Sequence, residues 1–303
     1  MKSIPVYFRP EMSVDSLGYS PSASKPEQVV ADWLASGLPI DLKAFDAATV
    51  TDLSHVHSCD YVKAVLSGEI ANGHGNTNLG VSRSCLLTVG SFMAAVEEAV
   101  ANGQVACSPT SGFHHAGFDY GRGYCTFNGL MAAAWRMMTH KWCVAIIDCD
   151  AHYGDGTQNI VTHKGLHDRV HHWTYGRDNS GAFQWDRFER RIRNFMEAFL
   201  NETEAARRIV FYQAGADVHV DDPLGPGEEG MFDADMRQRD RLIFELCRSH
   251  QVPVVWNLAG GYQRDEYGGI PKVLELHRAT MEEYVRCFVG TPEPYGVHSS
   301  VTA

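Results

Sequence analysis

The sequence is poor in positive charge. Among its 303 residues, Lys and Arg together number 26 and Asp and Glu number 37, so the formal net charge is −11. Proteins that bind nucleic acids or anionic membranes by general electrostatics need clustered Lys and Arg. The composition therefore argues against a nucleic-acid or membrane partner. It is compatible with cationic substrates such as lysine side chains or polyamines.

Long apolar runs, a cleavable leader and paired cysteines are missing as well. No uninterrupted run approaches the ~18 apolar residues of a membrane span, and Met1 to Pro10 has no basic flank, apolar centre or small-residue cleavage site. The eight cysteines form no CxxC pair, and several lie inside apolar runs, as buried reduced thiols do. These absences favour a cytoplasmic protein without a disulfide framework.

What the sequence does contain is a regular alternation of apolar, β-branched runs with helical stretches. The predicted strands are Val105–Ser108, Cys143–Asp150, Val170–Tyr175, Arg208–Ala214 and Pro253–Leu258. The predicted helices are Thr88–Ala101, Gly129–Thr139, Arg187–Glu204, Met236–Ser249 and Ile270–Phe288. Continuously apolar strands are typical of parallel sheets covered on both faces, and the alternation implies right-handed βαβ units. We expect an α/β, three-layer αβα fold around a central parallel sheet, formed by residues 1–303 as one catalytic domain.

Polar clusters follow four of the predicted strands directly. Their sequences are SPTSGFHHAG, DCDAHYGDG, AGADVHVDD and LAGGYQRD. In open α/β sheets the ligand site lies at the carboxyl ends of the strands. We therefore expect these clusters to meet at one edge of one sheet.

The spacing of Asp148, Asp150 and His152 indicates a metal site. In extended chain all three side chains point to the same face, and two carboxylates aimed together repel unless a cation or a proton lies between them. Asp150 and His152 offer the oxygen and nitrogen ligands that zinc favours, and Asp217 could supply the third. Three protein ligands and an open position form a catalytic arrangement. The alternative, that the aspartates cap a turn and His152 is an ordinary polar residue, is weakened by the neighbouring clusters.

Acid–base and oxyanion-stabilising side chains accompany this triplet. His114 and His115 could act as general base and general acid if separate carboxylates orient them, and Asp148 and Asp155 are available for that. The order in which the histidines act is left open. After Gly-Gly, the phenol of Tyr262 could donate a hydrogen bond to a developing oxyanion. Taken singly, each feature would fit surface histidines or a packing tyrosine, so the interpretation depends on their combination.

Together, these motifs resemble the histone deacetylase superfamily, within the arginase/deacetylase fold. The resemblance runs over roughly residues 55–280 in the order of the family. The matching segments are HSCDYVKAV (57–65), SGFHHAG (111–117), GYCTFN (123–128), DCDAHYGDGT (148–157), GAD (215–217) with DPLG (222–225), and LAGGY (258–262).

The resemblance implies one zinc ion per chain, bound by Asp150, His152 and Asp217. It implies tandem-histidine catalysis by His114 and His115, with Tyr262 polarising the scissile carbonyl. It also allows a potassium ion on backbone carbonyls around the DCDAH segment. The residues Val170–Trp173, which should complete that potassium site, depart from the usual pattern.

The same resemblance implies a tunnel for the substrate's acyl-amine stem. Gly123 and Tyr124 would line it, with Tyr124 where the family usually has phenylalanine. Leu224 stands where polyamine-preferring relatives carry a glutamate gatekeeper. The family's substrate-clamping aspartate should fall near Gly73–Thr77, which contains no carboxylate. The rim of the site is therefore expected to differ from that of typical relatives.

The sequence thus predicts a zinc-dependent hydrolase that removes acetyl or other acyl groups from amines, such as acetylated lysine side chains or small acetylated amines. An acetylpolyamine amidohydrolase is the alternative within the family. A ureohydrolase with two manganese ions would need another aspartate two residues after His152, where the chain has Gly154. A catalytically silent acyl-amine binding protein would usually have lost a ligand or the tyrosine. The physiological substrate, the acyl length and the oligomeric state are left open.

Overall fold

The computed structural model describes residues 2–16, 18–179, 181–202 and 207–290, and its centre is a seven-stranded parallel sheet. The strand order is β2-β1-β3-β7-β6-β4-β5. The strands are β1 (Ile4–Tyr7), β2 (Ile40–Lys43), β3 (Val105–Cys107), β4 (Cys143–Asp148), β5 (Val170–Thr174), β6 (Arg208–Gln213) and β7 (Val254–Asn257). Every pairing between these strands is parallel, which confirms the predicted sheet.

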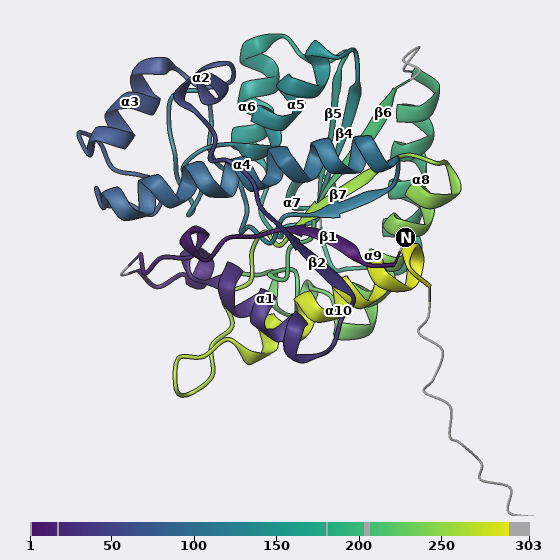
Figure 1. The fold of residues 1–303 in the computed structure, drawn as a ribbon. Helices are drawn as coiled ribbons and strands as arrows, with labels where there is room; N and C mark the ends of the chain where they lie inside the picture. The colour runs from purple at the N-terminus through teal and green to yellow at the C-terminus, as the bar shows by residue number, and fades with distance from the viewer. Residues whose placement is uncertain (1, 17, 180, 203–206, 291–303) are drawn as a thin grey trace, which may run out of the picture.

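Helices cover both faces of this sheet (Figure 1). Successive side chains of a strand point to opposite faces, so Ala145 and Ile147 belong to one hydrophobic core and Val144 and Ile146 to the other. The first core packs against α1 (Lys25–Ala35), α8 (Trp185–Glu202), α9 (Asp233–Ser249) and α10 (Pro271–Phe288). The second packs against α2 (Val50–Ser54), α3 (Cys59–Ser67), α4 (Leu79–Asn102), α5 (Gly129–Thr139) and α6 (Asp155–Lys164). The result is the predicted three-layer αβα fold.

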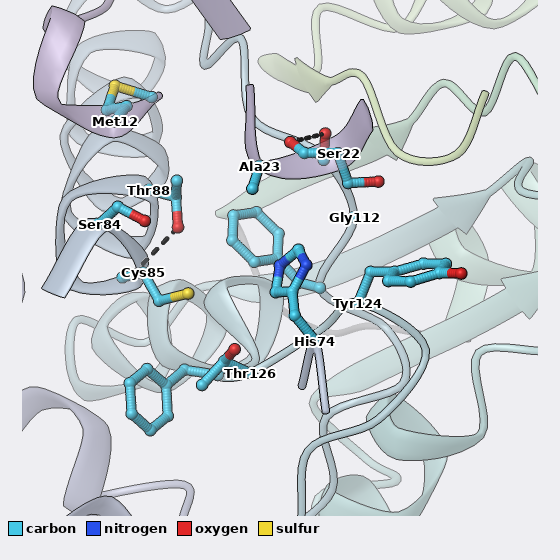
Figure 2. A pocket seen from close by; sticks show the side chains of 13 residues that line it. Met12, Ser22, Ala23, His74, Ser84, Cys85, Thr88, Gly112, Tyr124 and Thr126 are labelled. Atoms are coloured by element: carbon cyan, nitrogen blue, oxygen red, sulfur yellow. Dashed lines mark hydrogen bonds between the residues drawn. The ribbon is translucent and has the colours of Figure 1, made fainter. Parts of the chain in front are cut away.

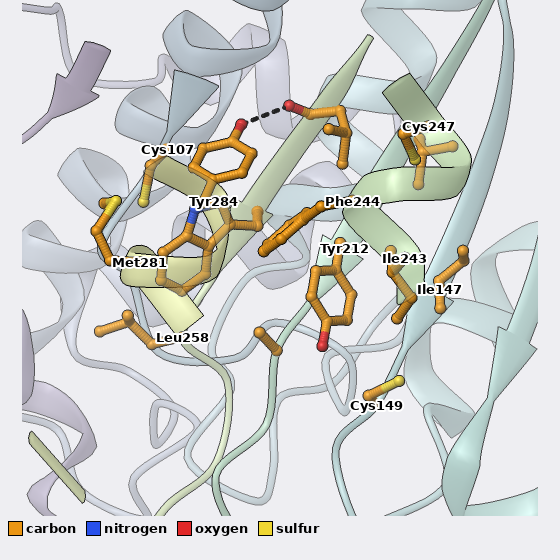
Figure 3. Close-up of a cluster of buried hydrophobic side chains, with 14 of the residues drawn as sticks. Cys107, Ile147, Cys149, Tyr212, Ile243, Phe244, Cys247, Leu258, Met281 and Tyr284 are labelled. Atoms are coloured by element: carbon orange, nitrogen blue, oxygen red, sulfur yellow. Dashed lines mark hydrogen bonds between the residues drawn. The ribbon is translucent and has the colours of Figure 1, made fainter. Parts of the chain in front are cut away.

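Figure 3 shows part of the first core, where α10 meets the middle of the sheet. The ring of Tyr284 lies with its centroid 4.6 Å from that of Phe244 on α9. Its hydroxyl oxygen lies 2.8 Å from the carbonyl oxygen of Val254 and 3.0 Å from that of Ala106. Because these carbonyls belong to β7 and β3, Tyr284 holds α10 against two neighbouring strands that lead into the polar clusters.

The predicted elements are found, but some of their limits were wrong. The strand predicted to reach Asp150 ends at Asp148, because the following residues turn to present their side chains to the site. The helix predicted from Thr88 begins at Leu79, where Asn78 accepts a hydrogen bond from the backbone of the first turn. The predicted end of α8 at Glu204 lies outside the described residues. Short elements of the N-terminal region, including β1, β2 and α1, were not predicted.

By length and composition, α4 could cross a membrane, with a mean hydropathy of 1.5 over its most apolar window. Serines and glycines divide this segment, so it contains no long uninterrupted apolar run. Of that window, 56% is buried inside the protein, and Phe92 and Val96 belong to the second core. Buried core helices commonly have this composition, and α4 packs on the sheet as one of them.

The eight cysteines all lie in the described residues and all are free thiols. Six of them are buried. The expectation of buried, unpaired cysteines is therefore confirmed for most of the set.

Candidate metal centre and active site

The predicted polar clusters meet at one edge of the sheet. The strands β3, β7, β6 and β4, which precede the clusters, are consecutive neighbours in the sheet. Their carboxyl ends point the same way because the sheet is parallel. Segments more than 100 residues apart in the chain therefore come into contact, as where the Gly260 amide meets the Asp150 carboxylate.

Asp150, His152 and Asp217 form a compact group of metal-ligand side chains. The candidate ligand atoms of these three residues lie within 4.8 Å of one another. Nδ1 of His152 lies 3.0 Å from Oδ1 of Asp150 and 3.1 Å from Oδ2 of Asp217. Asp150 and Asp217 are buried, whereas His152 is partly exposed. The group is therefore accessible to solvent on the side of His152.

Backbone amides hold the outer oxygens of the two carboxylates. The amide of Gly260 donates to Oδ2 of Asp150 at 2.9 Å, and the amide of Ala151 donates to Oδ1 of Asp217 at 3.1 Å. The remaining oxygens, Oδ1 of Asp150 and Oδ2 of Asp217, face His152. Such outer hydrogen bonds orient ligands around a metal. The donor set of two oxygens and one nitrogen is one that zinc favours.

The charges of this group also fit a cation. Burial and the negative charge of Asp150 raise the pKa of Asp217 to about 7. Burial opposes ionisation of Asp150 too, but the positive charge of His114 and the hydrogen bond from His152 hold its pKa well below the ordinary value. Hydrogen bonds to Asp150 and Asp217 raise the pKa of His152 to about 11. Two buried carboxylates so close together need positive charge between them, which a divalent ion supplies.

His114 and Asp148 form a buried pair beside the metal group. Nδ1 of His114 lies 2.7 Å from Oδ2 of Asp148, and its Nε2 lies 3.6 Å from Oδ1 of Asp150. The other oxygen of Asp148 accepts hydrogen bonds from Nε2 of Gln213 at 2.8 Å and from the amide of Asp150 at 3.1 Å. Burial disfavours the charged form of His114, but the carboxylates of Asp148 and Asp150 outweigh it and raise its pKa to about 9.

His115 and Asp155 form a second, more exposed pair. Nδ1 of His115 lies 2.6 Å from Oδ1 of Asp155, and the other oxygen of Asp155 pairs with Arg122. Burial and the positive charge of His114 lower the pKa of His115. The ring centroids of the two histidines are 4.1 Å apart. One histidine thus favours the cationic form and its neighbour the neutral form, which offers both a proton donor and a proton acceptor in one place.

Tyr262 and Tyr124 face each other across the site, with ring centroids 5.7 Å apart. Tyr262 is 6% exposed, and its amide donates to Oδ2 of Asp222 at 2.7 Å. The other oxygen of Asp222 accepts from the amide of Leu224 at 3.0 Å, and Leu224 is 38% exposed. Asp222 therefore fixes the tyrosine and the predicted gate residue relative to each other. Gly123 lies against the ring of His115, so the predicted tunnel residues are at this site.

Sequence reasoning gave no role to Lys25, Asp222 or Gln213. Lys25 on α1 is fully buried, and its Nζ donates to the carbonyl oxygens of Ala259 and Gly260 at 2.6 and 3.2 Å. Burial lowers the pKa of Lys25 to about 8. A lysine in the first turn of a helix ordinarily indicates a solvated position, so its local sequence carried no signal. Asp222 could have been found from its place in the DPLG segment.

A cavity of about 40 Å³ lies beside Tyr124 (Figure 2). It is bounded by α4 through Cys85 and Thr88, by the N-terminal segment through Met12 and Ser22, and by His74. Nδ1 of His74 is buried without a hydrogen-bond partner among the described residues, and burial lowers the pKa of His74 to about 4. The space has room for about one water molecule.

Comparison with known proteins adds family information to this geometry. A family model described as the histone deacetylase domain matches residues 22–183. An uncharacterised protein of Picosynechococcus sp. is 28% identical over 258 residues, which cover 77% of this chain and 82% of that protein. Histone deacetylase 2 of Arabidopsis thaliana is 28% identical over 253 residues, 72% of this chain but only 62% of the plant protein. The chain thus spans less than two thirds of that plant relative.

Solved structures share the fold over nearly the whole chain. The crystal structure of the HDA15 HD domain superposes with a TM-score of 0.73 at 18% identity, covering 97% of this chain and 91% of that one. An acetylpolyamine aminohydrolase from Burkholderia pseudomallei superposes with a TM-score of 0.69 at 18% identity, covering 93% and 99%. At this identity the likeness establishes the fold, and the sequence match carries the family assignment.

Proposed function

The chain belongs to the histone deacetylase family, and from this premise we propose that it is a zinc-dependent amidohydrolase that removes acetyl or similar acyl groups from amines. The observation that best supports the proposal is the metal-ligand group of Asp150, His152 and Asp217, in contact with His114 and with the ring of His115. Amide hydrolysis needs an electrophile, two proton transfers and a stabilised oxyanion. The residues at this edge of the sheet can provide all of these.

When bound, zinc supplies Lewis-acid polarisation of the acyl carbonyl and lowers the pKa of water to ~7. The two His–Asp pairs then divide the proton transfers: one imidazole takes the proton of the attacking water and the other protonates the leaving amine. Asp148 and Asp155 hold the ring nitrogens that face away from the reaction. The Tyr262 hydroxyl donates to the oxygen of the scissile carbonyl as negative charge develops there.

The rim of the site supports compact acyl-amines as substrates, including acetylated lysine side chains. Leu224 offers an apolar, exposed surface at the predicted gate, and Gly73–Thr77 offers no carboxylate to bind a peptide backbone. We therefore propose weak dependence on the residues flanking an acetyl-lysine. Acetylated polyamines are the second candidate, supported by a 42% identical match over 60 residues to the acetylpolyamine amidohydrolase of Mycoplana ramosa, which covers 20% of this chain and 17% of that one.

The geometry gives no support to a binuclear ureohydrolase. The described part of the chain contains one group of three or more His, Cys, Asp or Glu side chains close enough to hold a metal ion. Its members are Asp150, His152 and Asp217. At residue 154, where a bridging carboxylate would be needed, a glycine packs against Asp148 and His172. Residue 154 therefore offers no side-chain ligand to a second metal ion.

The proposal is tested by turnover of zinc-loaded protein on acetyl-lysine peptides, acetylpolyamines and small acetylated metabolites. Asp217→Asn replaces a candidate ligand carboxylate by an amide of almost the same shape. The control variant Asp221→Asn makes the same change four residues later, in a side chain that is 76% exposed. We expect metal-dependent amide hydrolysis by the wild type and by Asp221→Asn, and none by Asp217→Asn. Binding of acyl-amines without hydrolysis would instead indicate a silent binding protein.

A further inference from the structure

The turn from Gly121 to Cys125 connects the outer histidine pair with the wall of the tunnel. Gly123 and Tyr124 both have left-handed backbone conformations, with φ of 54° and 65°. The turn is closed by a bridge between Arg122 and Cys125, in which the amide of Cys125 donates to the carbonyl of Arg122 at 2.9 Å. A left-handed tyrosine is strained and persists only where surrounding contacts fix it.

Gly123 and Tyr124 each contact a functional ring. A β-carbon at residue 123 would lie 2.5 Å from Cδ2 of His115, so the turn lies directly on that imidazole. The ring of Tyr124 faces that of Tyr262. The backbone amide of Tyr124 donates to the carbonyl of Gly73 at 2.9 Å. A displacement of this turn would therefore move the tunnel wall and release one side of His115.

Arg122 joins the turn to the carboxylate that holds His115. Its guanidinium pairs with Oδ2 of Asp155, while Oδ1 of Asp155 lies 2.6 Å from Nδ1 of His115. One carboxylate thus bridges the arginine of the turn and the histidine of the site. The Arg122 side chain is 63% exposed and that of Asp155 is 18% exposed, so the bridge lies at the surface of the site.

The inner pair is held in a different way. Asp148 is completely buried and accepts hydrogen bonds from Gln213 and from the amide of Asp150 in addition to its contact with His114. For the Asp155 side chain, the hydrogen bonds within the described residues are those with His115 and Arg122. Buried hydrogen bonds from Gln213 and a backbone amide orient the carboxylate of Asp148. The carboxylate of Asp155 depends on Arg122 for its orientation instead.

We propose that Arg122 is a positioning residue: through Asp155 it fixes the ring of His115, and through its own turn it ties that ring to the tunnel wall formed by Gly123 and Tyr124. The inference rests on the proposed function, because it assigns Arg122 a role in the same site. An exposed ion pair contributes little to folding stability. In contrast, displacing a catalytic group by ~1 Å can cost ~100-fold in rate. Arg122 should therefore matter for turnover much more than for folding.

The test uses the full-length, zinc-loaded protein and the variants Arg122→Ala and Arg122→Lys, with Arg136→Ala as control. Arg136 on α5 is likewise an exposed arginine in an ion pair, with Glu97 on α4, and neither residue belongs to the candidate site. We expect Arg122→Ala to lower kcat ~10- to 100-fold with KM changed less than ~3-fold, because orientation is lost and not ground-state binding. Added guanidinium should restore part of the kcat of Arg122→Ala. Arg122→Lys should retain more activity than Arg122→Ala but less than the wild type, because the lysine ammonium lacks the planar set of N–H donors of a guanidinium. Zinc content and melting temperature should stay unchanged.

A double-mutant cycle and a structure complete the test. If Arg122 acts through Asp155, Arg122→Ala should add little to the loss caused by Asp155→Asn, whereas multiplied losses would contradict the proposal. A crystal structure of Arg122→Ala should show Asp155 or the His115 ring displaced, and an unmoved pair would overturn the proposal. The structural readout needs no turnover. An inactive wild type would therefore count against the proposed function alone, and the position of the pair would still decide the role of Arg122.

Discussion

A β-carbon at residue 260 would lie 2.2 Å from Oδ2 of Asp217, and Gly260 therefore packs directly against one of the candidate metal ligands. The same atom would lie 2.8 Å from Oδ2 of Asp150, to which the Gly260 amide donates its hydrogen bond. The backbone of the loop after β7 thus forms one wall of the group. No side chain fits at residue 260 without displacing a carboxylate.

This relationship predicts that Gly260→Ala loses metal. The added methyl group must push Asp217 or Asp150 out of position, so we expect zinc stoichiometry, measured by mass spectrometry of the metal, to fall together with activity. Gly112→Ala is the matched control, because its β-carbon would meet its nearest neighbours at 3.5 Å, an ordinary contact. Full zinc occupancy in Gly260→Ala would show that the loop moves freely and does not shape the group.

Tyr262→Phe separates transition-state stabilisation from binding. The substitution keeps the buried ring and deletes the hydroxyl, and loss of one oxyanion donor typically lowers turnover ~10²- to 10³-fold, about 2.7–4 kcal/mol. Because the hydroxyl belongs to none of the candidate metal-ligand side chains, zinc content and melting temperature should barely change. Steady-state kinetics on several acyl-amines would measure the effect. Near-full turnover on all of them would make Tyr262 a packing residue only.

Leu224→Glu should change the choice of substrate. Leu224, the predicted gate residue, is exposed, and a carboxylate there would attract the distal ammonium groups of acetylated polyamines. We expect the ratio of kcat/KM for acetylpolyamine over acetyl-lysine peptide to rise ~10-fold, about 1.4 kcal/mol. Leu224→Gln introduces a side chain of nearly the same shape as glutamate but without its charge, so this variant should leave the ratio of kcat/KM values close to that of the wild type. A wild type that already prefers polyamines by ~100-fold would contradict the proposed reading of the rim.

His57 should make folding stability depend on pH below neutrality. Its Nδ1 donates to the carbonyl of Gly117 at 2.7 Å and its Nε2 accepts from the amide of Asn128 at 2.9 Å, so the buried ring is neutral. Burial lowers the pKa of His57 to about 4 from 6.5. Between these values the unfolded chain binds a proton that the folded chain does not. Stability is therefore complete above pH 6.5 and decreases as the pH falls towards 4.

The size of this effect follows from the same two values. The difference between the unfolded and folded pKa values of His57 corresponds to a contribution of about 3 kcal/mol to the free energy of unfolding. Urea unfolding at several pH values would measure it, with His57→Gln as the variant that cannot titrate and the exposed His140→Gln as control. We expect wild-type stability to fall relative to His57→Gln on acidification, and parallel curves would contradict the assignment.

The predictable part of this molecule was the part with local periodicity. The apolar run Cys143–Ile147 predicted the buried strand, and the polar residues directly after it could be placed at the end of that strand. Because the strand ends at Asp148, a turn and not the extended spacing brings Asp150 and His152 into the candidate metal group. Parallel pairing then brought the clusters to one edge. The strand order, by contrast, cannot be read from any single segment.

The parts that escaped prediction depend on contacts between distant segments. β1 has only four residues, too few for a periodic signal, yet it pairs with both β2 and β3. Lys25 reaches carbonyls 234 and 235 residues away, and nothing in its neighbourhood distinguishes it from a solvated lysine. Likewise, only the folded turn shows that Arg122 and His115 share Asp155.

The place of β7 in the sheet has a consequence for how the protein is made. β7 is the last strand along the chain, but it lies between β3 and β6, in the interior of the sheet. Until residues 254–257 have left the ribosome, the strands synthesised earlier can form only two separate ribbons, β2-β1-β3 and β6-β4-β5, with an unfilled slot between them. The loop that carries Gly260 and Tyr262 follows that strand immediately. A nascent chain therefore completes its sheet and its candidate metal site in one late step, when residues 254–262 become available.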